Sequence, residues 1–347
     1  MNETLGNPNT ANDANSTSSP DLHVFPRNFI VFWIVTYYVL LGCGAFLNLV
    51  VVYVMLRSRK IRTSISSFLM FHLSLTHVLY HVAVPLLRQN DFNNSPHSCK
   101  AFVLMELSCA AAIFSSLAAI AWDRQRNILQ PFKSLAPRRL KTYLVLLTAI
   151  WIYSLVSSTP FIYSVRTKTQ EICWKAENGT KKCEKYAFCH SPIDWETQLS
   201  KTLYFIMAFI VPFMYMLVTY TKIAVSLWKR SKTGKIHGAV AKCKAKTIRL
   251  MVTALLVFAV CWGSNFTVDL LRVYGLLKNL SLESDVMLRI WCLIAQASSS
   301  CLNPIIYAFF SPEFRKNCFK FCCCCFSCCM YFCRLSRYSP NRVQPAL

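Results

Sequence analysis

The chain has 347 residues, of which 54% are hydrophobic and 15% are charged, and its formal net charge is +23. This composition leaves little beyond apolar segments and short loops, and it predicts one membrane-embedded domain rather than a soluble one. A basic chain also suits a nucleic-acid partner. The positions of the charges, given below, have a simpler explanation in membrane topology.

Seven apolar stretches follow one another along the chain. Each holds about 20 or more mainly apolar residues, enough to cross a hydrocarbon core about 30 Å thick. The first stretch is too long and starts too late for a cleavable signal peptide, so we expect it to insert as a span. The predicted spans are Phe29–Leu56, Ile65–Leu87, Phe102–Leu129, Tyr143–Tyr163, Leu203–Leu227, Ile248–Tyr274 and Val286–Phe309. The sequence therefore predicts an all-α fold, a seven-transmembrane helix bundle.

Charge indicates the orientation of the bundle. Most of the 38 Lys and Arg residues follow spans one, three, five and seven, whereas of the 15 acidic residues only Asp123 and Glu313 belong to those segments. Positive charge gathers on cytoplasmic loops. We therefore expect a multi-pass plasma-membrane protein with its N-terminus extracellular and its C-terminus cytoplasmic, and no nucleic-acid partner.

Asn-x-Ser/Thr sequons support the same sides, because five of them lie in predicted outer segments. Asn265-Phe266-Thr267 falls inside span six and is expected to be plain helix. Residues 1–28, rich in Asn, Ser and Thr, are predicted to form a disordered glycosylated tail, and residues 29–310 the seven-transmembrane domain. The expected glycosylation sites are Asn2, Asn15, Asn93, Asn178 and Asn279.

Polar, aromatic and proline residues recur at distinctive places in the spans. They are Asn48, Asp123-Arg124-Gln125, Trp151, Pro212, Tyr220, Phe258, Cys261, Trp262 and Asn303-Pro304-Ile305-Ile306-Tyr307. Over about residues 29–321 this set resembles the rhodopsin-like (class A) G-protein-coupled receptors. The resemblance implies a receptor for an extracellular ligand, a peptide or a cationic small molecule, that activates heterotrimeric G proteins. Arrestin and membrane lipids are the other implied partners.

Two other functional classes need weighing. A non-signalling scavenger or decoy receptor is the alternative, because the motifs of spans two and six are altered. An enzyme is not expected, since no nucleophile, base and orienting group can be placed together, and no cofactor or metal is predicted.

The activation residues are assigned by the same resemblance. Arg124, next to Asp123, would be held in the inactive state and would swing toward Tyr220 and Tyr307 when span six moves outward. A charge at this depth needs a partner. The residues expected to carry activation and coupling are Asp123, Arg124, Tyr220, Asn303, Pro304 and Tyr307.

Four cysteines lie on the predicted outer side. By resemblance, Cys99 bridges to the second outer loop, where Cys173, Cys183 and Cys189 compete. Cys183 and Cys189 are favoured because they lie nearer span five. The remaining two could pair with each other and staple the loop.

Cysteines also crowd the segment after span seven. Residues 311–347 are predicted to form an amphipathic helix 8 and a Cys-rich cytoplasmic tail, with palmitoylation favoured over a zinc site. The candidate palmitoylation sites are Cys318, Cys322, Cys323, Cys324 and Cys325.

Several positions depart from the family pattern. His77 replaces the usual sodium-binding Asp and is expected to be neutral and hydrogen-bonded to Asn48 or Asn303; a proton switch and a metal site with His81 are the alternatives. Ser264 replaces the usual span-six Pro. No acid lies between residues 222 and 249 to lock Arg124, which predicts ligand-free activity.

The decisive candidate for ligand binding is Glu106, an acid inside span three. Its alternative role is a salt bridge to Arg88, Arg272 or Arg289. A long second loop favours a peptide with a cationic group. The predicted ligand-binding residues are Glu106, Trp262, Asn265, Phe266, Asp269 and Gln296.

Overall fold

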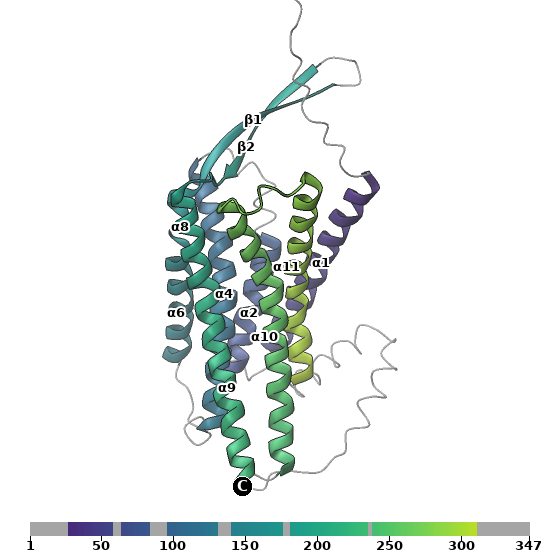
Figure 1. Ribbon diagram of the computed structural model, residues 1–347. Helices are drawn as coiled ribbons and strands as arrows, with labels where there is room; N and C mark the ends of the chain where they lie inside the picture. Colours follow the sequence, from purple (N-terminus) through teal and green to yellow (C-terminus); the bar gives the residue numbers. More distant parts are fainter. Residues whose placement is uncertain are drawn as a thin grey trace, which may run out of the picture.

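The computed structural model describes residues 27–57, 64–83, 96–130, 140–175, 181–234 and 238–310. Within them, seven helical rods stand side by side with a two-stranded hairpin above one end (Figure 1). The predicted all-α bundle is confirmed. In chain order the rods are α1 (Arg27–Arg57); α2 (Ile65–Val78) with the π-helix η2 (Leu79–Ala83); α4 (Pro96–Leu129); α6 (Leu140–Ser158) with α7 (Phe161–Ser164); α8 (Trp195–Tyr204), η4 (Phe205–Ile210) and α9 (Val211–Lys232); α10 (Gly238–Val273); and α11 (Leu282–Phe310).

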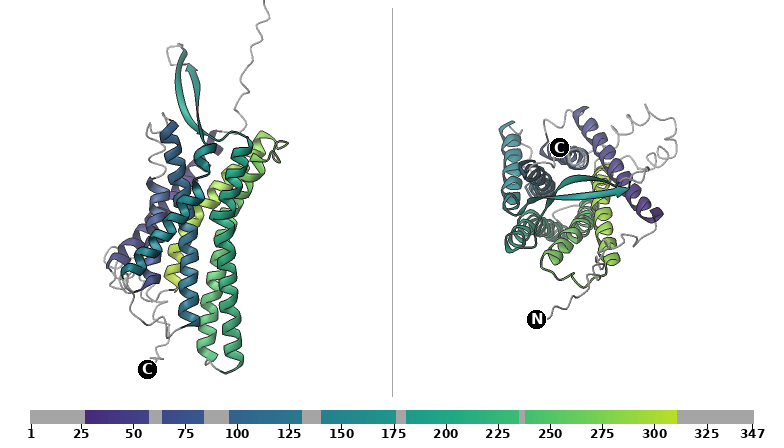
Figure 2. Two further views of the ribbon diagram at one scale, coloured as in Figure 1. Left: turned by 90° about the vertical axis from the view of Figure 1, so that its left-hand side faces the viewer. Right: turned by 90° about the horizontal axis from the view of Figure 1, so that it is seen from above.

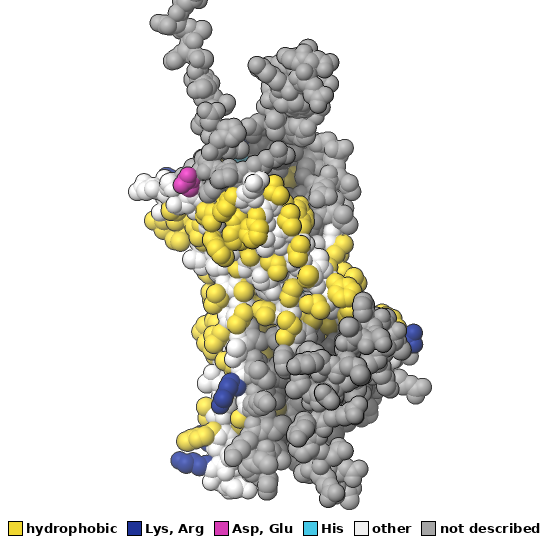
Figure 3. Space-filling model, turned by 90° about the vertical axis from the view of Figure 1, so that its right-hand side faces the viewer, with side chains coloured by type: hydrophobic (Ala, Val, Ile, Leu, Met, Phe, Trp, Pro, Cys, Tyr) yellow, Lys and Arg dark blue, Asp and Glu magenta, His cyan; other side chains and the backbone are white. Residues whose placement is uncertain are grey.

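The outward faces of the rods are apolar. Six helices in the described part of the chain are long and apolar enough to cross a membrane. Large hydrophobic side chains such as Phe32 and Val260 are 60% and 70% exposed, and Figure 3 shows hydrophobic side chains covering much of one flank. A bilayer accommodates such a surface, and a helix satisfies its backbone hydrogen bonds there. The seventh rod, α11, carries buried polar side chains: Gln296, Ser299, Ser300 and Asn303.

The rods close into a ring (Figure 2). The long helix α4 packs against α2, α6 and α9, while α1 packs against α2 and α11, and α10 against α9 and α11. The α1–α11 contact is close at Gly44, where an added Cβ would lie only 1.9 Å from Ser300 Oγ. A residue without a side chain is therefore required there.

Two rods contain π-helical turns. One is η2 at the upper end of α2, and the other is η4, which comes immediately before Val211 and Pro212. Proline has no N–H to donate to the preceding turn, and a widened turn is one way for a helix to accommodate the lost bond. Pro212, one of the motif residues, thus lies beside an irregular segment of helix.

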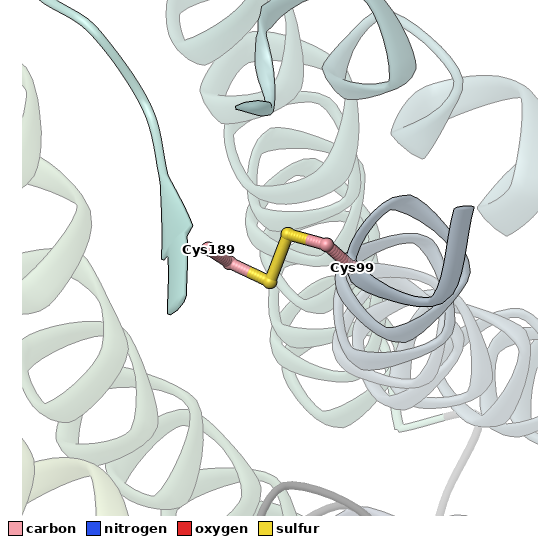
Figure 4. The surroundings of a disulfide bond; sticks show 2 residues. All are labelled: Cys99 and Cys189. Atoms are coloured by element: carbon pink, nitrogen blue, oxygen red, sulfur yellow. A yellow bond between two sulfur atoms is a disulfide. The ribbon is translucent and has the colours of Figure 1, made fainter. Parts of the chain in front are cut away.

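The segment between α7 and α8 forms a hairpin that was not predicted from the sequence. Strands β1 (Arg166–Lys175) and β2 (Lys181–His190) pair antiparallel, and seen from above they run across the bundle (Figure 2). A disulfide joins Cys189 at the end of β2 to Cys99 of α4 (Figure 4). Cys99 was predicted to bridge to Cys183 or Cys189, and Cys189 is the partner. Cys183 lies six residues back along β2, about 20 Å of strand away.

Parts of the predicted organisation lie outside the described residues. These are the first 26 residues, the helix 8 and palmitoylation sites after residue 310, and the sequons at Asn93 and Asn178. Asn279 is described, and it is exposed in the turn between α10 and α11.

Candidate ligand-binding and activation site

A chain of side-chain hydrogen bonds crosses the upper half of the bundle. Asn265 of α10 donates through Nδ2 to Gln296 Oε1 of α11 at 2.7 Å, and Gln296 Nε2 donates to the Tyr80 hydroxyl of η2 at 2.7 Å. These hydrogen bonds therefore join three rods. Two of its members, Asn265 and Gln296, were predicted ligand-binding residues, and the structure brings them into direct contact.

Aromatic rings form a floor beside this chain. Trp262 is 1% exposed and donates through Nε1 to Ser299 Oγ at 2.8 Å. Its ring lies 5.6 Å from that of Tyr80 and 6.2 Å from that of Phe266, measured between centroids. The predicted pair Trp262 and Phe266 thus lies together. Further aromatic side chains that pack on these two residues are Phe114, Tyr204, Phe205, Phe209 and Phe258.

Glu106 lies on α4 at the level of this cluster. Its carboxylate interacts electrostatically with the hydroxyl groups of Tyr80 and Tyr204. Tyr204 also donates a hydrogen bond to the backbone oxygen of Leu107 at 2.8 Å, which fixes α8 against α4. The acid predicted to bind ligand therefore lies near Tyr80 and Tyr204 of the polar and aromatic cluster.

Two arginines that were alternative partners of Glu106 bind another acid. Arg272 Nη2 lies 2.5 Å from Asp285 Oδ1, and Arg289 Nε lies 3.1 Å from Asp285 Oδ2. The hydrogen bond from Arg272 holds the pKa of Asp285 below its usual value. The third alternative, Arg88, lies outside the described residues.

Charged side chains also line the mouth of the bundle. Lys201 Nζ of α8 lies 2.9 Å from Asp269 Oδ2 of α10. Asp269 is a predicted ligand-binding residue, and its side chain is 50% exposed. At the base of the hairpin, Arg166 Nη2 lies 3.5 Å from Asp194 Oδ2. Asp194 caps α8 by accepting from the Thr197 backbone N–H at 2.9 Å, which lowers the pKa of its carboxyl group. Asp269 therefore lies nearer the surface than the other predicted members.

Deeper in the bundle, a buried polar contact joins α2 to α11. His77 Nε2 lies 2.7 Å from Asn303 Nδ2, and both residues are almost fully buried. The expected hydrogen bond between His77 and Asn303 is thus present. The His81 ring stacks on that of His77 at 5.7 Å, and neither of its ring nitrogens has a hydrogen-bond partner among the described residues.

The opposite end of the bundle holds the predicted coupling residues. Asp123 is 2% exposed and accepts hydrogen bonds from Ser66 of α2 and, at 2.9 Å, from Asn127. Arg124 Nε has no hydrogen-bond partner in the described part of the chain, and the Arg124 guanidinium interacts electrostatically with Tyr220 of α9. Asp123 thus ties α4 to α2, and Arg124 faces α9.

Two more of the predicted activation residues belong to the end of α11. Pro304 lies inside that helix, as predicted. Tyr307 also belongs to α11, but its side chain lies outside the described part.

Several residues of this arrangement were missed from the sequence. Tyr80, Ser299 and Tyr204 look like ordinary helix positions, since nothing in the local pattern distinguishes them. Lys201 could have been found from the sequence, because a lysine at the top of span five is a suitable partner for Asp269, the acid of span six. No arrangement suited to covalent chemistry was found among the described residues, and the geometry suits binding at one end and a change of helix contacts at the other.

Comparisons with known proteins agree with this geometry. Residues 47–307 match the family described as 7 transmembrane receptor (rhodopsin family). The chain is 26% identical to a QRFP-like peptide receptor of Branchiostoma floridae over 89% of the chain and 80% of that protein. It is 24% identical to the pyroglutamylated RF-amide peptide receptor of Rattus norvegicus over 78% of the chain and 65% of that protein. It is 25% identical to galanin receptor 2a of Danio rerio over 86% of the chain and 81% of that protein.

These proteins are receptors and not enzymes, as expected from the sequence. The match covers five complete rods, most of α11 and the last third of α1. The chain is a multi-pass membrane protein and belongs to the rhodopsin family of seven-transmembrane receptors.

Proposed function

We propose that this chain is a cell-surface receptor that binds an extracellular peptide beneath the hairpin and activates a heterotrimeric G protein. The observation that carries the proposal is the hydrogen-bonded chain from Asn265 through Gln296 to Tyr80, which lies beside the Trp262 ring. A ligand that inserts polar groups here must rearrange contacts among three rods at once. Binding at this place therefore changes the relative stability of helix arrangements.

The chemistry of the cluster favours a peptide with a cationic and an aromatic group. Glu106 supplies a negative charge, the ring of Phe266 supplies an apolar surface, and the side-chain amides of Asn265 and Gln296 supply donors and acceptors. Relatives are named for peptides, among them an RF-amide peptide. An Arg-Phe-amide end carries a cation, a ring and a terminal amide, which is the combination that these groups can accept.

Transmission follows the contacts between α10 and α11. The hydrogen bond from Trp262 to Ser299 lies one step below the ligand cluster, and the contact between Asn303 and His77 lies deeper on the same helix. Pro304 interrupts the hydrogen bonding of α11 just beyond. A shift of α10 at Trp262 can therefore reach the end where Arg124 and Tyr220 meet.

The remaining assignments belong to the same proposal. The N-terminus is extracellular and glycosylated, the tail after residue 310 forms a palmitoylated helix 8, and arrestin and lipids bind on the cytoplasmic side. The charge pattern of the sequence supports this orientation. The hairpin and its disulfide to Cys99 then lie in the oxidising extracellular space.

Coupling is tested by expressing the chain beside Arg124→Ala at equal surface density and measuring G-protein dissociation, without ligand and with a peptide panel. The panel contains Arg-Phe-amide peptides, galanin and small amines. We expect a ligand-free signal that Arg124→Ala abolishes and a further response to an Arg-Phe-amide peptide. A silent receptor that still takes up labelled peptide would replace the proposal with a scavenger function.

Ligand recognition is tested separately with a matched pair of acid-to-amide variants. Glu106→Gln removes a charge-assisted contact and should lower the potency of a cationic peptide about 10- to 100-fold. Glu283→Gln removes an exposed acid from the first turn of α11 and should leave potency unchanged. Equal potency of both variants and the parent would contradict the assigned role of Glu106.

A further inference from the structure

Two cysteines of the hairpin hold facing positions. The register of β1 and β2 places Cys173 directly opposite Cys183, just as it places Arg166 opposite His190 at the base. Cys189, the other cysteine of β2, is bonded to Cys99. Cys173 and Cys183 therefore remain as the two loop cysteines outside that bond.

The backbone spacing at facing positions suits a disulfide. Opposed residues of an antiparallel pair have Cα atoms about 4.5 to 5.5 Å apart, and disulfides join residues whose Cα atoms are about 4.4 to 6.8 Å apart. The competing pair Cys173 and Cys189 is excluded by the same register, because Thr167 lies opposite Cys189. Six residues of strand separate Thr167 from Cys173, which is about 20 Å.

We infer that Cys173 and Cys183 form a second disulfide across the hairpin. Each thiol loses its proton, a Sγ–Sγ bond forms, and the two electrons reduce the disulfide of a dithiol oxidoreductase of the secretory pathway to its dithiol. The bond closes residues 174–182 into a small loop that holds the Asn178 sequon. The inference rests on the proposed extracellular position of the hairpin.

The bond gives the hairpin a property that its strands alone lack. A two-stranded hairpin is marginally stable in water, and a slip of one residue would turn every side chain to the opposite face. Cys99–Cys189 fixes only the base of the hairpin. The second disulfide holds the register at the far end, so the receptor presents one defined lid surface to a ligand.

Tryptic mapping of the purified full-length receptor tests the assignment without reduction. After alkylation of free thiols, trypsin separates the four cysteines into the peptides Gln89–Lys100, Thr169–Lys175, Cys183–Lys185 and Tyr186–Lys201, and the Asn178 sequon leaves on its own peptide. We expect Thr169–Lys175 linked to Cys183–Lys185, and Gln89–Lys100 linked to Tyr186–Lys201.

The second linked pair serves as the control. If it is intact while Cys173 and Cys183 are both alkylated, the inference is overturned and the proposed topology stands. If all four cysteines are alkylated, the extracellular position of the hairpin fails together with the inference.

Labelling of intact cells with a membrane-impermeant maleimide gives a second readout. Cys173→Ser and Cys183→Ser each leave one unpaired thiol and should raise surface labelling several-fold over the parent. The double variant should return to the parent level. Parent labelling as strong as that of the single variants would overturn the assignment.

Discussion

Replacing Gly44 by alanine tests the close contact between α1 and α11. An added Cβ would lie 1.9 Å from Ser300 Oγ and 2.9 Å from Ser300 Cβ, far inside ordinary contact distance. Ser300 can turn away only by losing its hydrogen bond to the Ala297 oxygen at 2.7 Å. Its own backbone oxygen also accepts from Asn48 Nδ2 at 3.0 Å, so a shift of the whole helix would strain that bond too.

The expected cost follows from this overlap. Overpacking of a close contact costs about 1–3 kcal/mol, which lowers the unfolding temperature by about 2–12 °C at about 2–4 °C per kcal/mol. The assay is thermal unfolding of purified Gly44→Ala receptor in detergent, followed with a thiol-reactive dye. Gly42→Ala is the matched control, because no atom lies within 4 Å of the Cβ added there. That variant should unfold at or slightly above the temperature of the parent, because Ala is favoured over Gly within a helix by up to about 1 kcal/mol.

A rescue variant separates overpacking from other effects of the new methyl group. Combining Gly44→Ala with Ser300→Gly removes both atoms that collide and should restore most of the lost stability, although Gly within a helix carries its own cost of about 1 kcal/mol. The reasoning is refuted if Gly44→Ala unfolds at the same temperature as Gly42→Ala.

Three further results are expected. A double-mutant cycle of Tyr80→Phe and Gln296→Leu should give a coupling free energy of unfolding of about 0.6–1.7 kcal/mol, because the two residues share a 2.7 Å hydrogen bond; strict additivity would contradict that bond. The folded-state pKa of Asp285 is lowered by its arginine partners, so its contribution to stability is present above about pH 4 and is lost as pH falls further. Asp285→Asn should therefore weaken the fall of melting temperature below about pH 4. An unchanged fall would show that Asp285 does not cause it. His77→Leu should lower stability by about 1–3 kcal/mol because it leaves the Asn303 amide without its 2.7 Å partner, and a melt like that of the parent would show that this contact contributes nothing.

The helix bundle was predictable because each apolar stretch in the sequence is long. A run such as Phe29–Leu56 is too apolar for water and long enough for a bilayer, so span number and span position follow from hydropathy. The hairpin had no comparable signal. Its strands are mostly polar and lack a regular apolar alternation, and the pairing of Cys99 with Cys189 depends on their path through space.

The candidate site was predictable in part for a similar reason. Glu106 and Asp269 stand out because acids are rare inside spans, and Trp262 belongs to a motif with distinctive spacing. Tyr80 carries no such mark, since a tyrosine at the end of a span is common. Its role arises from the contact of η2 with α11, which no local pattern specifies.

The π-helical segment η4 also changes how the fifth rod responds to insertions and deletions. Each residue of an α-helix turns the chain by about 100°, and a π turn accommodates one residue more than an α turn. Lys201 and Tyr204 precede η4, whereas Tyr220 follows it. Deleting one residue from η4 would leave a regular helix in which Lys201 and Tyr204 still face as they do now relative to Tyr220, because an α turn completes one turn with one residue fewer. The same deletion within the regular helix α9, before Tyr220, would instead rotate the two parts by about 100° against each other. The irregular turns thus hold one extra residue without changing the rotational phase between the two ends of this rod.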